Sequence, residues 1–590
     1  MLDLKISGGE IVDGTGRARW RGDVGVKDGR IVAIGDLASE PAKEHHDATG
    51  RIVAPGFIDG HTHYDAQVFW DPTLSPSCYH GVTTVIGGFC GFSIAPITPE
   101  SAGYIKPMLA RVEGMPLETL EAALDCDWTS FGSYLDKLDG KMGLNVGFFA
   151  GHSAIRRVVM GERAVGGKAT SCDIAEMREL LDQSLKQGAL GFSTTVAESH
   201  NDGDGNPVPS RFAEREEFIG LCEIVKQHEG TGLEFLPNLD FPPEMVELMA
   251  DMSVTAQRPM NWNVLVVTGR ADTEARIQRH LAVSDRAREK GGEVIALTVP
   301  NVPLSHMTLR SGFAFEVMPG LWREIFKVPP EQRIEMFKDP GIRQQLLDDG
   351  ETLLGTGATY EHLPKFGDYT IVAAVAEANK IYEGRTIGDI AAELGKTPFD
   401  TMLDIAIADN LDTIVVPGLG GEDAKSYELR GRLWADDRTL IGASDAGAHL
   451  DLIDTFSFSS VVLQTGVREH KVISLEQAVH KMTQRPARYY GLVDRGVVAE
   501  GCHADLVIFD PDTVGRGKTY FRYDLPGASA AFRLYAEAEG IDHVLVNGVP
   551  IVRNGEHLGR FPGTVLRSGK DTRTVAMDVM RIRQDEPLSA

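Results

Sequence analysis

The sequence predicts an α/β fold: a parallel (β/α)8 TIM-like barrel with a small β-sandwich domain formed from both chain ends. In the middle of the 590-residue chain, eight short apolar segments alternate with amphipathic helical segments, as right-handed crossovers around a barrel require. The two ends instead carry β-branched runs broken by Gly and Asp, which favour a sheet. A doubly wound open sheet is the alternative, but the first strand of the middle region is not followed by a Gly-rich phosphate-binding turn.

The domain boundaries follow from this change in composition along the chain. Runs such as "LKISGGEIVDG" near the start resemble "ADLVIFDPDTV" and "IDHVLVNGVPIVRNGEHLG" near the end. We therefore expect residues 1–54 and 488–565 to form the composite β-sandwich domain and residues 55–487 to form the barrel. Residues 566–590 are expected to be a C-terminal tail. Residues 300–437 are too long for an ordinary connection, so we expect a lid-like insertion at the barrel mouth.

Each barrel strand is predicted from an apolar run of strand length. In chain order, the runs are "GFIDGH", "GVTTVIGGF", "LNVGFFAGH", "GALGFST", "GLEFLP", "NWNVLVV", "EVIALTV" and "TLIGASD". Two of the helices expected between them are "EMRELLDQSLKQG" and "EEFIGLCEIVKQHEG", whose apolar residues fall on one stripe and whose last residue is a glycine.

Composition excludes several classes of partner. A formal charge of −26 at pH 7 disfavours nucleic acid and anionic membranes. The first residues lack the basic end and apolar run of a secretory signal, and we find no apolar stretch long enough to span a membrane. Six scattered cysteines indicate reduced thiols. We therefore expect a cytoplasmic protein that acts on a small-molecule substrate. A homo-oligomer is compatible with the sequence.

The stretch "IDGHTHYDA" places two histidines directly after the first barrel strand. In a strand, residues two apart share one face, so His61 and His63 point the same way and can chelate a metal ion. The alternative is that both are solvated polar residues at a strand end, which is common for a pair of histidines taken alone.

Other chemically capable residues lie at the carboxyl ends of the predicted strands, where barrels of this kind carry their active sites. Cys90 ends the second strand, His152 the third and Asp445 the eighth, and Glu234 lies in the fifth. Each has a structural interpretation as a buried thiol, a core histidine, a turn-forming aspartate or an ion-paired glutamate. Their joint placement on one rim favours a shared site.

The chemistry that this set implies is metal-assisted hydrolysis. We expect His61, His63, Cys90, Asp445 and Glu234 to hold one or two divalent ions, with Zn²⁺ as the first choice for a mixed nitrogen, sulfur and oxygen set. A bound ion lowers the pKa of its water from about 15.7 to about 7. Asp445 is expected to act as the general acid/base.

The motifs resemble the amidohydrolase superfamily and, within it, the N-acyl-D-amino-acid deacylase branch. The resemblance is carried by "VAPGFIDGHTHYDAQ", "GVTTVIGGFCGFS", "GHSAIRRVVMG", "LIGASDAGAH" and "KMTQRPARYYGLVDRGVVAEGCHADLVIFDPDTV". It implies a metal-dependent barrel with a small β-sandwich. It also implies that His61, His63 and Cys90 are metal ligands, and that Asp445 is both a ligand and the general acid/base.

The chain departs from that branch on the fifth and sixth strands. Histidines expected there are absent from "LEFLPN" and "NWNVLVV", so Glu234 or Asn263 is a candidate replacement ligand. A single metal ion held by His61, His63, Asp445 and Cys90 is the other possibility. The lysine and tyrosine that would hold a substrate carboxylate are also missing. Arg310 is a candidate anion ligand, and a more apolar amide, lactam, imide or ester is an alternative substrate.

We therefore expect a metal-dependent hydrolase that cleaves a C–N amide bond in an N-acyl amino acid or similar acylated amine. A cyclic amide, imide or ester hydrolase of the same superfamily is one alternative, although no lysine ends the fourth strand "GALGFSTT" to supply a bridging carboxylated lysine. A catalytically silent barrel scaffold is the other. The joint retention of His61, His63, Cys90 and Asp445 argues against it.

Overall fold

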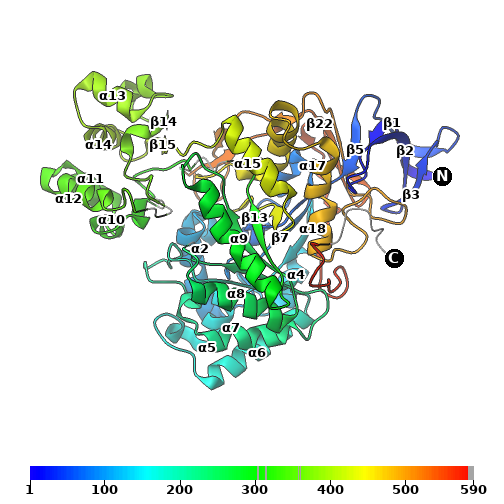
Figure 1. Ribbon diagram of the computed structural model, residues 1–590, viewed down its shortest axis with the longest axis horizontal. Coiled ribbons are helices and arrows are strands. Elements are labelled where there is room, and N and C mark those ends of the chain that lie inside the picture. The colour runs from blue at the N-terminus through cyan, green and yellow to red at the C-terminus, as the bar shows by residue number, and fades with distance from the viewer. Residues whose placement is uncertain are drawn as a thin grey trace.

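A closed barrel of parallel strands lies at the centre of the computed structural model, which describes residues 1–581 except 239, 302–304, 313–314, 357, 359 and 530. Figure 1 shows the barrel surrounded by helices, with a sheet domain at one side and a separate lobe at the other. The barrel strands are β6 (Phe57–Asp59), β7 (Val82–Gly87), β8 (Asn145–Phe148), β9 (Ala150–Gly151), β10 (Gly191–Thr195), β11 (Gly232–Leu236), β12 (Met260–Leu265), β13 (Val294–Thr298) and β16 (Thr439–Ile441).

The strand pairings close the barrel. β6, β7 and β8 pair in that order, and β9, β10, β11, β12, β13 and β16 pair in that order. β8 and β9 are pieces of one extended run, so the described residues form eight staves. A parallel bridge between Thr62 and Ala446 joins the last stave to the first, and the His63 N–H donates to the Ala446 carbonyl at 2.8 Å. All eight predicted strands are confirmed, and with them the predicted barrel.

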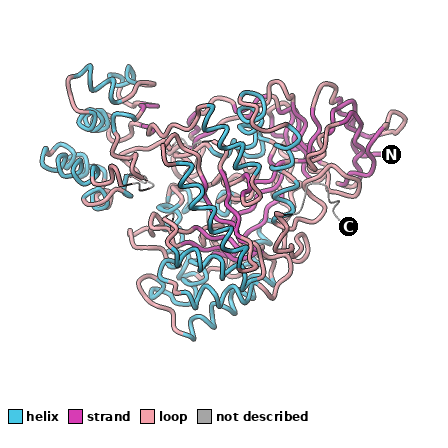
Figure 2. Tube along the Cα trace, viewed as in Figure 1, coloured by secondary structure: helices cyan, strands magenta, loops and turns pink. Residues whose placement is uncertain are grey.

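Helices cover the outside of the barrel between successive strands (Figure 2). They are α2 (Pro99–Val112), α3 (Leu117–Ala123), α4 (Phe131–Leu138), α5 (His152–Met160), α6 (Ser171–Lys186), α7 (Arg215–Val225), α8 (Pro243–Ala256), α9 (Thr273–Glu289), α15 (Ala424–Ala435), α17 (Leu475–Met482) and α18 (Gln484–Tyr489). Capping boxes start α2, α4 and α6, which satisfies their first backbone N–H groups. Both predicted helices are present, as α6 and α7, although α7 ends at Val225, before the glycine.

Both chain ends contribute to one mixed sheet of nine strands within the described residues. Its order is β24-β23-β22-β17-β5-β1-β2-β3, with β4 also paired to β1. The antiparallel pair of β5 and β17 joins the two ends of the chain. The strands are β1 (Leu2–Ile11), β2 (Trp20–Lys27), β3 (Arg30–Gly35), β4 (Ala42–Asp47), β5 (Ile52–Pro55), β17 (Leu506–Phe509), β22 (Ile541–Val546), β23 (Val549–Arg553) and β24 (Glu556–His557).

The segment between β17 and β22 leaves this sheet and packs on the barrel. It forms two short ribbons, β18 (Gly515–Arg516) with β21 (Ala538–Glu539) and β19 (Tyr520–Arg522) with β20 (Arg533–Tyr535). The Leu534 N–H donates to the Leu450 carbonyl at 2.6 Å. Arg516 pairs with the buried carboxyl of Asp454 at 2.7 Å. The returning C-terminal segment therefore supports the loop that follows β16.

The insertion between β13 and β16 forms a lobe with its own apolar core, drawn at the left of Figure 1. Its elements are α10 (Leu321–Ile325), α11 (Pro330–Lys338), α12 (Pro340–Glu351), β14 (Thr370–Ala373), α13 (Ile387–Leu394), α14 (Pro398–Ala408) and β15 (Ile414–Val416). Arg111 at the end of α2 pairs with Glu316 at 2.5 Å, which ties the lobe to the barrel. Arg310 pairs with Asp412 inside the lobe and is therefore already neutralised there.

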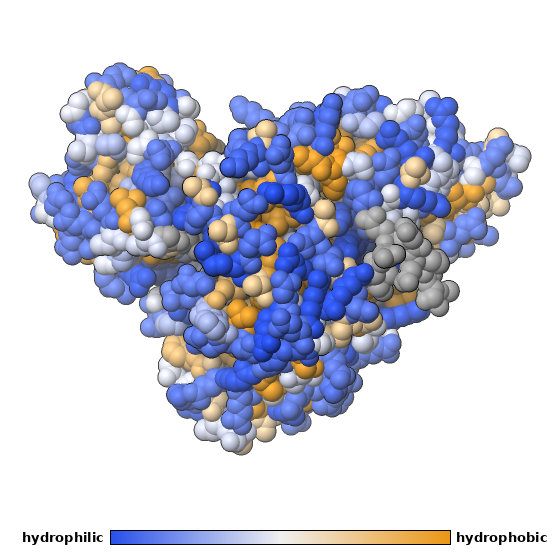
Figure 3. Space-filling model, viewed as in Figure 1, coloured by the Kyte–Doolittle hydropathy of each residue, from blue (hydrophilic) through white to orange (hydrophobic). Residues whose placement is uncertain are grey.

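The surface agrees with the charged composition. The face drawn in Figure 3 is mostly hydrophilic, with scattered apolar patches. The six cysteines, all in described positions, are free thiols. Across the part of the chain that the structure describes, we find no helix with both the length and the hydrophobicity to cross a lipid bilayer.

We predict that His80 makes stability depend on acid pH. Its buried ring donates to the Ala536 carbonyl through Nε2 at 3.0 Å and lies 2.7 Å from the Ser460 hydroxyl. Burial lowers its pKa from 6.5 to about 4, which outweighs the hydrogen bond to Ala536. The unfolded chain therefore binds the proton more readily, and the stabilisation is complete above about pH 6.5 and falls as the pH drops towards 4.

The measurement compares wild type with His80→Gln by urea unfolding at several pH values. Between pH 7 and pH 4, the free energy of unfolding of wild type should fall by up to about 3 kcal/mol more than that of the variant. Parallel pH profiles for the two proteins would contradict the prediction.

Candidate metal centre

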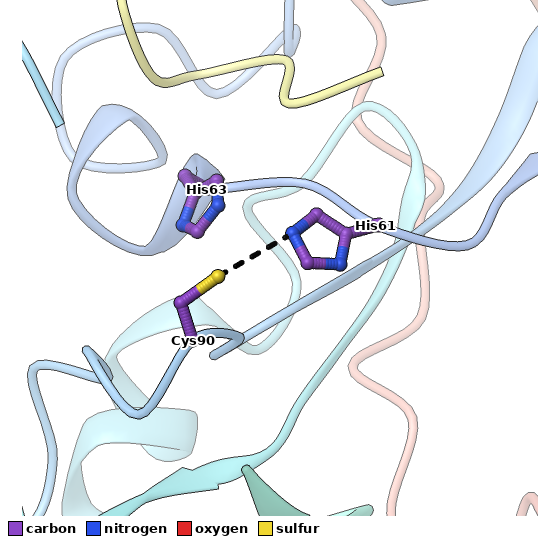
Figure 4. Close-up of side chains that lie close together, drawn as sticks. All are labelled: His61, His63 and Cys90. Carbon is purple, nitrogen blue, oxygen red and sulfur yellow. Dashed lines mark hydrogen bonds between the residues drawn. The ribbon is translucent and has the colours of Figure 1, made fainter. Parts of the chain in front are cut away.

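Two histidines and a cysteine from the first two strand ends face one another inside the barrel mouth. His61 and His63 follow β6, and Cys90 follows β7. One ligand atom from each lies within 4.8 Å of the others, and all three side chains are buried. Sγ of Cys90 is 3.8 Å from Nε2 of His61, and Figure 4 shows both rings around the sulfur atom. The structure therefore brings together three predicted ligands from two strands.

Asp445, which follows β16, completes the group from the last stave, which is joined to the first stave by the bridge between Thr62 and Ala446. Its Oδ1 lies 3.2 Å from Nε2 of His61 and 3.7 Å from Nε2 of His63. Its side chain is 24% exposed, whereas the two histidines are almost fully buried. Asp445 is therefore the member of the group that both faces the imidazoles and reaches the solvent-accessible mouth.

The fifth and sixth strands also direct side chains at this centre. Glu234 of β11 is fully buried, accepts the Cys90 N–H through Oε2 at 2.9 Å, and places Oε1 4.0 Å from the Cys90 sulfur. Nδ2 of Asn263, in β12, lies 3.2 Å from Nε2 of His61 and 3.9 Å from the same sulfur. Both candidates for the missing histidines thus face the centre.

His152 does not join the group, although it also ends a barrel strand. Its Nδ1 lies 2.8 Å from the Thr194 hydroxyl, and its Nε2 lies 2.8 Å from the Glu217 carboxyl. Both ring nitrogens are satisfied by buried neighbours, so the structural interpretation of His152 holds.

Sequence reasoning missed Glu113, a buried residue directly after α2. Its Oε1 lies 3.3 Å from Nδ1 of His63, and its carbonyl accepts the His449 N–H at 2.5 Å. Glu113 stands at the end of a helix and not at a strand end, so the strand-end rule could not find it. His449 lies in the quoted motif "LIGASDAGAH", where the aspartate alone drew attention.

The backbone around the centre is strained. Cys90, Ala443, Asp445 and His449 have φ values of 54°, 58°, 51° and 47°, which cost energy for residues other than glycine. Such conformations persist only where the surroundings hold them. They cluster here on the two loops that carry the thiol and the carboxylate, as is typical of functional sites.

Asp59 helps to hold the loop after β16. This fully buried carboxyl accepts the Ser444 hydroxyl at 2.5 Å and the His61 N–H at 3.4 Å. Burial raises the pKa of Asp59 to about 7, against the effect of these hydrogen bonds. Asp59 thus contacts the backbone of His61 and the side chain of Ser444, which precedes Asp445.

The centre is electrostatically crowded. Burial raises the pKa values of the Cys90 thiol and the Glu234 carboxyl well above their usual ranges, and nearby carboxyls raise them further. Burial lowers the pKa of His63 well below its usual range. Burial would also raise the pKa of Asp445, but the contact with His61 and the charges of both histidines lower it. A bound cation would stabilise the deprotonated forms of the thiol and the carboxyls, against the effect of burial.

The donor set fits a divalent cation. Oδ1 of Asp445 and Oδ1 of Asn263 are buried without a hydrogen-bond partner among the described residues, and buried polar atoms normally have one. Imidazole nitrogen, thiol sulfur and carboxylate oxygen are the ligand types that Zn²⁺ takes. These residues are therefore better satisfied by a bound metal ion than by hydrogen bonds to one another.

Comparisons with known proteins agree with this geometry. The sequence model of the amidohydrolase family matches residues 44–552. Two relatives come from Alcaligenes xylosoxydans xylosoxydans. D-aminoacylase is 28% identical over 570 residues, which cover 96% of this chain and 97% of the relative. N-acyl-D-glutamate deacylase is 29% identical over 586 residues, which cover 96% of each.

Two solved structures share the fold over almost the whole chain. A crystal structure of D-aminoacylase has a TM-score of 0.65 and 26% identity, covering 96% of this chain and 100% of that one. N-acyl-D-glutamate deacylase from Bordetella bronchiseptica, complexed with zinc and a phosphonate inhibitor, has a TM-score of 0.63 and 28% identity at the same coverage.

We predict that Asp59 stabilises the metal centre. Asp59→Ala leaves the His61 N–H without its buried acceptor and leaves the Ser444 hydroxyl with the longer contact to the His61 carbonyl at 3.5 Å, which should lower the free energy of unfolding by about 1–3 kcal/mol. Asp59→Asn keeps an acceptor and should lose less. Urea unfolding of the three proteins checks the order. An alanine variant as stable as wild type would show that Asp59 does not hold the loop.

Proposed function

This chain belongs to the amidohydrolase family, whose model matches residues 44–552, and we propose that it is a metal-dependent hydrolase of a C–N amide bond in an N-acyl amino acid or similar acylated amine. The resemblance drawn from the sequence is thereby confirmed at the level of the family. One observation carries the proposal: the side chains of His61, His63, Cys90 and Asp445 face one another at the mouth of a closed barrel.

We propose that these four residues hold the metal ion, with Glu234 beside Cys90. The relative from Bordetella bronchiseptica was crystallised with zinc, and D-aminoacylase has a binuclear metal centre, which supports one or two divalent ions with Zn²⁺ as the first choice. A bound divalent ion supplies activated water at neutral pH. Asn263, at 3.2 Å from Nε2 of His61, is placed to donate a hydrogen bond to an oxygen atom at the centre.

Asp445 is proposed to move the proton. Its carboxylate faces both imidazoles and is also partly exposed, so it can accept a proton from the attacking water and deliver it to the leaving nitrogen. The strained φ of 51° at Asp445 and the support of Ser444 by Asp59 keep this carboxylate turned towards the centre. The chain thus supplies both the proton carrier and its orientation.

The names of the relatives support an acylated amino acid as the substrate class. The charges around the centre favour a weakly charged member of that class. Burial has the largest effect on the pKa values of Cys90, Glu234 and Asp445, and the charged groups that act on them are carboxyls and imidazoles. Arg310, the candidate anion ligand, already pairs with Asp412. We therefore propose that the enzyme prefers acylated amines that carry no charge on the part remote from the amide bond that is cleaved.

The first test is metal dependence. Purified protein should contain about one to two divalent ions per chain. Removal by a chelator should abolish hydrolysis, and Zn²⁺ or Mn²⁺ should restore it. Elemental analysis measures the metal, and a panel of N-acyl-D- and N-acyl-L-amino acids, anilides, lactams and esters measures hydrolysis. Protein that holds no ion and gains no activity from added metal would refute the proposal.

The second test concerns Asp445. Asp445→Asn should fold normally but lose turnover by about a hundredfold or more, because the amide cannot carry the proton. Asp437→Asn is the matched control, since Asp437 lies just before the opposite end of the same strand and pairs with Arg288 at 2.9 Å. The control should turn over substrate at the wild-type rate. Normal turnover by Asp445→Asn would remove its assigned role.

A further inference from the structure

We infer that Glu113 is a positioning residue of the metal centre, which accepts the Nδ1 proton of His63 and so keeps Nε2 of that ring directed at the cation. This inference rests on the proposed metal-dependent function. It adds to the centre a residue from outside the strand ends and outside the sequence motifs that predict the other ligands.

The two nitrogens of His63 face different partners. Nδ1 lies 3.3 Å from Oε1 of Glu113, and Nε2 lies 3.7 Å from Oδ1 of Asp445. The side chains of His63 and Glu113 are 7% and 3% exposed, so water competes little for either group. Each nitrogen of the ring therefore has a carboxyl as its neighbour, Glu113 at Nδ1 and Asp445 at Nε2.

The position of the proton on the imidazole ring decides which nitrogen can bind a metal ion. A neutral imidazole carries one proton, and a metal ion binds the nitrogen that lacks it. A carboxylate at Nδ1 holds the proton there, leaves the lone pair on Nε2 and makes that nitrogen a stronger donor. Glu113 is the group in contact with Nδ1. Burial raises the pKa of its carboxyl well above the usual range, and a cation at the centre would favour the ionised form, which accepts the Nδ1 proton and leaves Nε2 free to bind.

The backbone fixes Glu113 in place. Its N–H donates to the Leu109 carbonyl at 2.9 Å at the end of α2, and its carbonyl accepts the His449 N–H at 2.5 Å. The next residue, Gly114, has φ of 58°, and a Cβ there would lie 3.3 Å from Cα of His449. This close approach locks the end of α2 against the loop that carries Asp445. A carboxyl held in this way can orient a ring.

His61 is oriented by different means, which shows that the contact at His63 is specific. Nδ1 of His61 is buried and finds no hydrogen-bond partner in the described part of the chain. Its ring instead stacks on Phe89, with centroids 4.5 Å apart and planes 9° from parallel. Of the two histidines, His63 alone therefore has a carboxyl beside its Nδ1 among the described residues.

Glu113 acts through His63 and not as a direct ligand. Its Oε1 lies 3.3 Å from Nδ1 of His63, whereas Oδ1 of Asp445 lies near Nε2 of both His61 and His63. The two carboxyls therefore contact different nitrogens of the His63 ring.

The test measures the Zn²⁺ affinity of the full-length protein by competition with a chromophoric chelator, without using activity. Glu113→Ala should bind Zn²⁺ about 10–100-fold more weakly than wild type. Glu113→Gln should lose about tenfold or less, because its amide oxygen still accepts the Nδ1 proton. The absorption spectrum of the Co²⁺-loaded protein should change in the alanine variant and stay close to wild type in the glutamine variant.

Glu217→Gln is the matched control. Glu217 is also a buried carboxyl beside a histidine, 2.8 Å from Nε2 of His152, but that histidine lies outside the centre. Its Zn²⁺ affinity should equal that of wild type. An equal loss in Glu217→Gln would show that any broken carboxyl–histidine pair loosens the barrel, and would overturn the inference.

Unchanged Zn²⁺ affinity in Glu113→Ala would also overturn it. If the alanine variant does not fold, Glu113→Asp carries the test, because its shorter side chain withdraws the carboxyl from Nδ1 of His63, and wild-type affinity in that variant would overturn the inference. Wild-type protein that binds no Zn²⁺ would instead refute the proposed function. Wild-type protein that binds Zn²⁺ and hydrolyses amides, with unaffected Glu113 variants, would refute only the role of Glu113.

Discussion

Closure of the barrel is the constraint on which the site depends. The parallel bridge between Thr62 and Ala446 joins the first and last staves, and the Asp445 N–H donates to the His61 carbonyl at 3.2 Å in the same seam. The seam is therefore also the place where an imidazole from one end of the barrel sequence meets a carboxylate from the other. Backbone pairing sets the distance between this imidazole and this carboxylate, so the geometry of the proposed site and the closure of the barrel depend on the same hydrogen bonds.

The centre is assembled from groups that would repel one another or stay neutral without a cation. Burial pushes the Cys90 thiol and the Glu234 carboxyl towards their protonated forms, and the surrounding structure holds the backbone of Cys90 and Asp445 in strained conformations. The hydrophobic core around the barrel provides the stability that this arrangement costs. Such an arrangement suits the binding of a cation better than the stability of the fold.

The sequence predicts the parts of this protein that follow a local rule. Apolar runs locate the eight staves, and the rule that sites lie at the carboxyl ends of strands finds His61, His63, Cys90, Glu234 and Asp445. This rule does not find Glu113, because the position of Glu113 depends on how the end of α2 packs against the loop after β16. The pairing of Arg310 with Asp412 is equally invisible, since both lie in a lobe whose internal packing has no simple periodic pattern. The two ribbons between β17 and β22 share the β-rich composition of the sheet but pack on the barrel.

The sheet built from both chain ends also has a consequence for biosynthesis. In β5, Pro55 pairs with Leu506 of β17, so the edge of β5 has no partner until nearly the whole chain has left the ribosome. An unpaired strand edge invites association with other chains, and contacts between distant residues form slowly. The sheet can therefore be completed only after the barrel strands have been synthesised. Truncation before β17 would leave the edge of β5 unpaired and open to association with other chains.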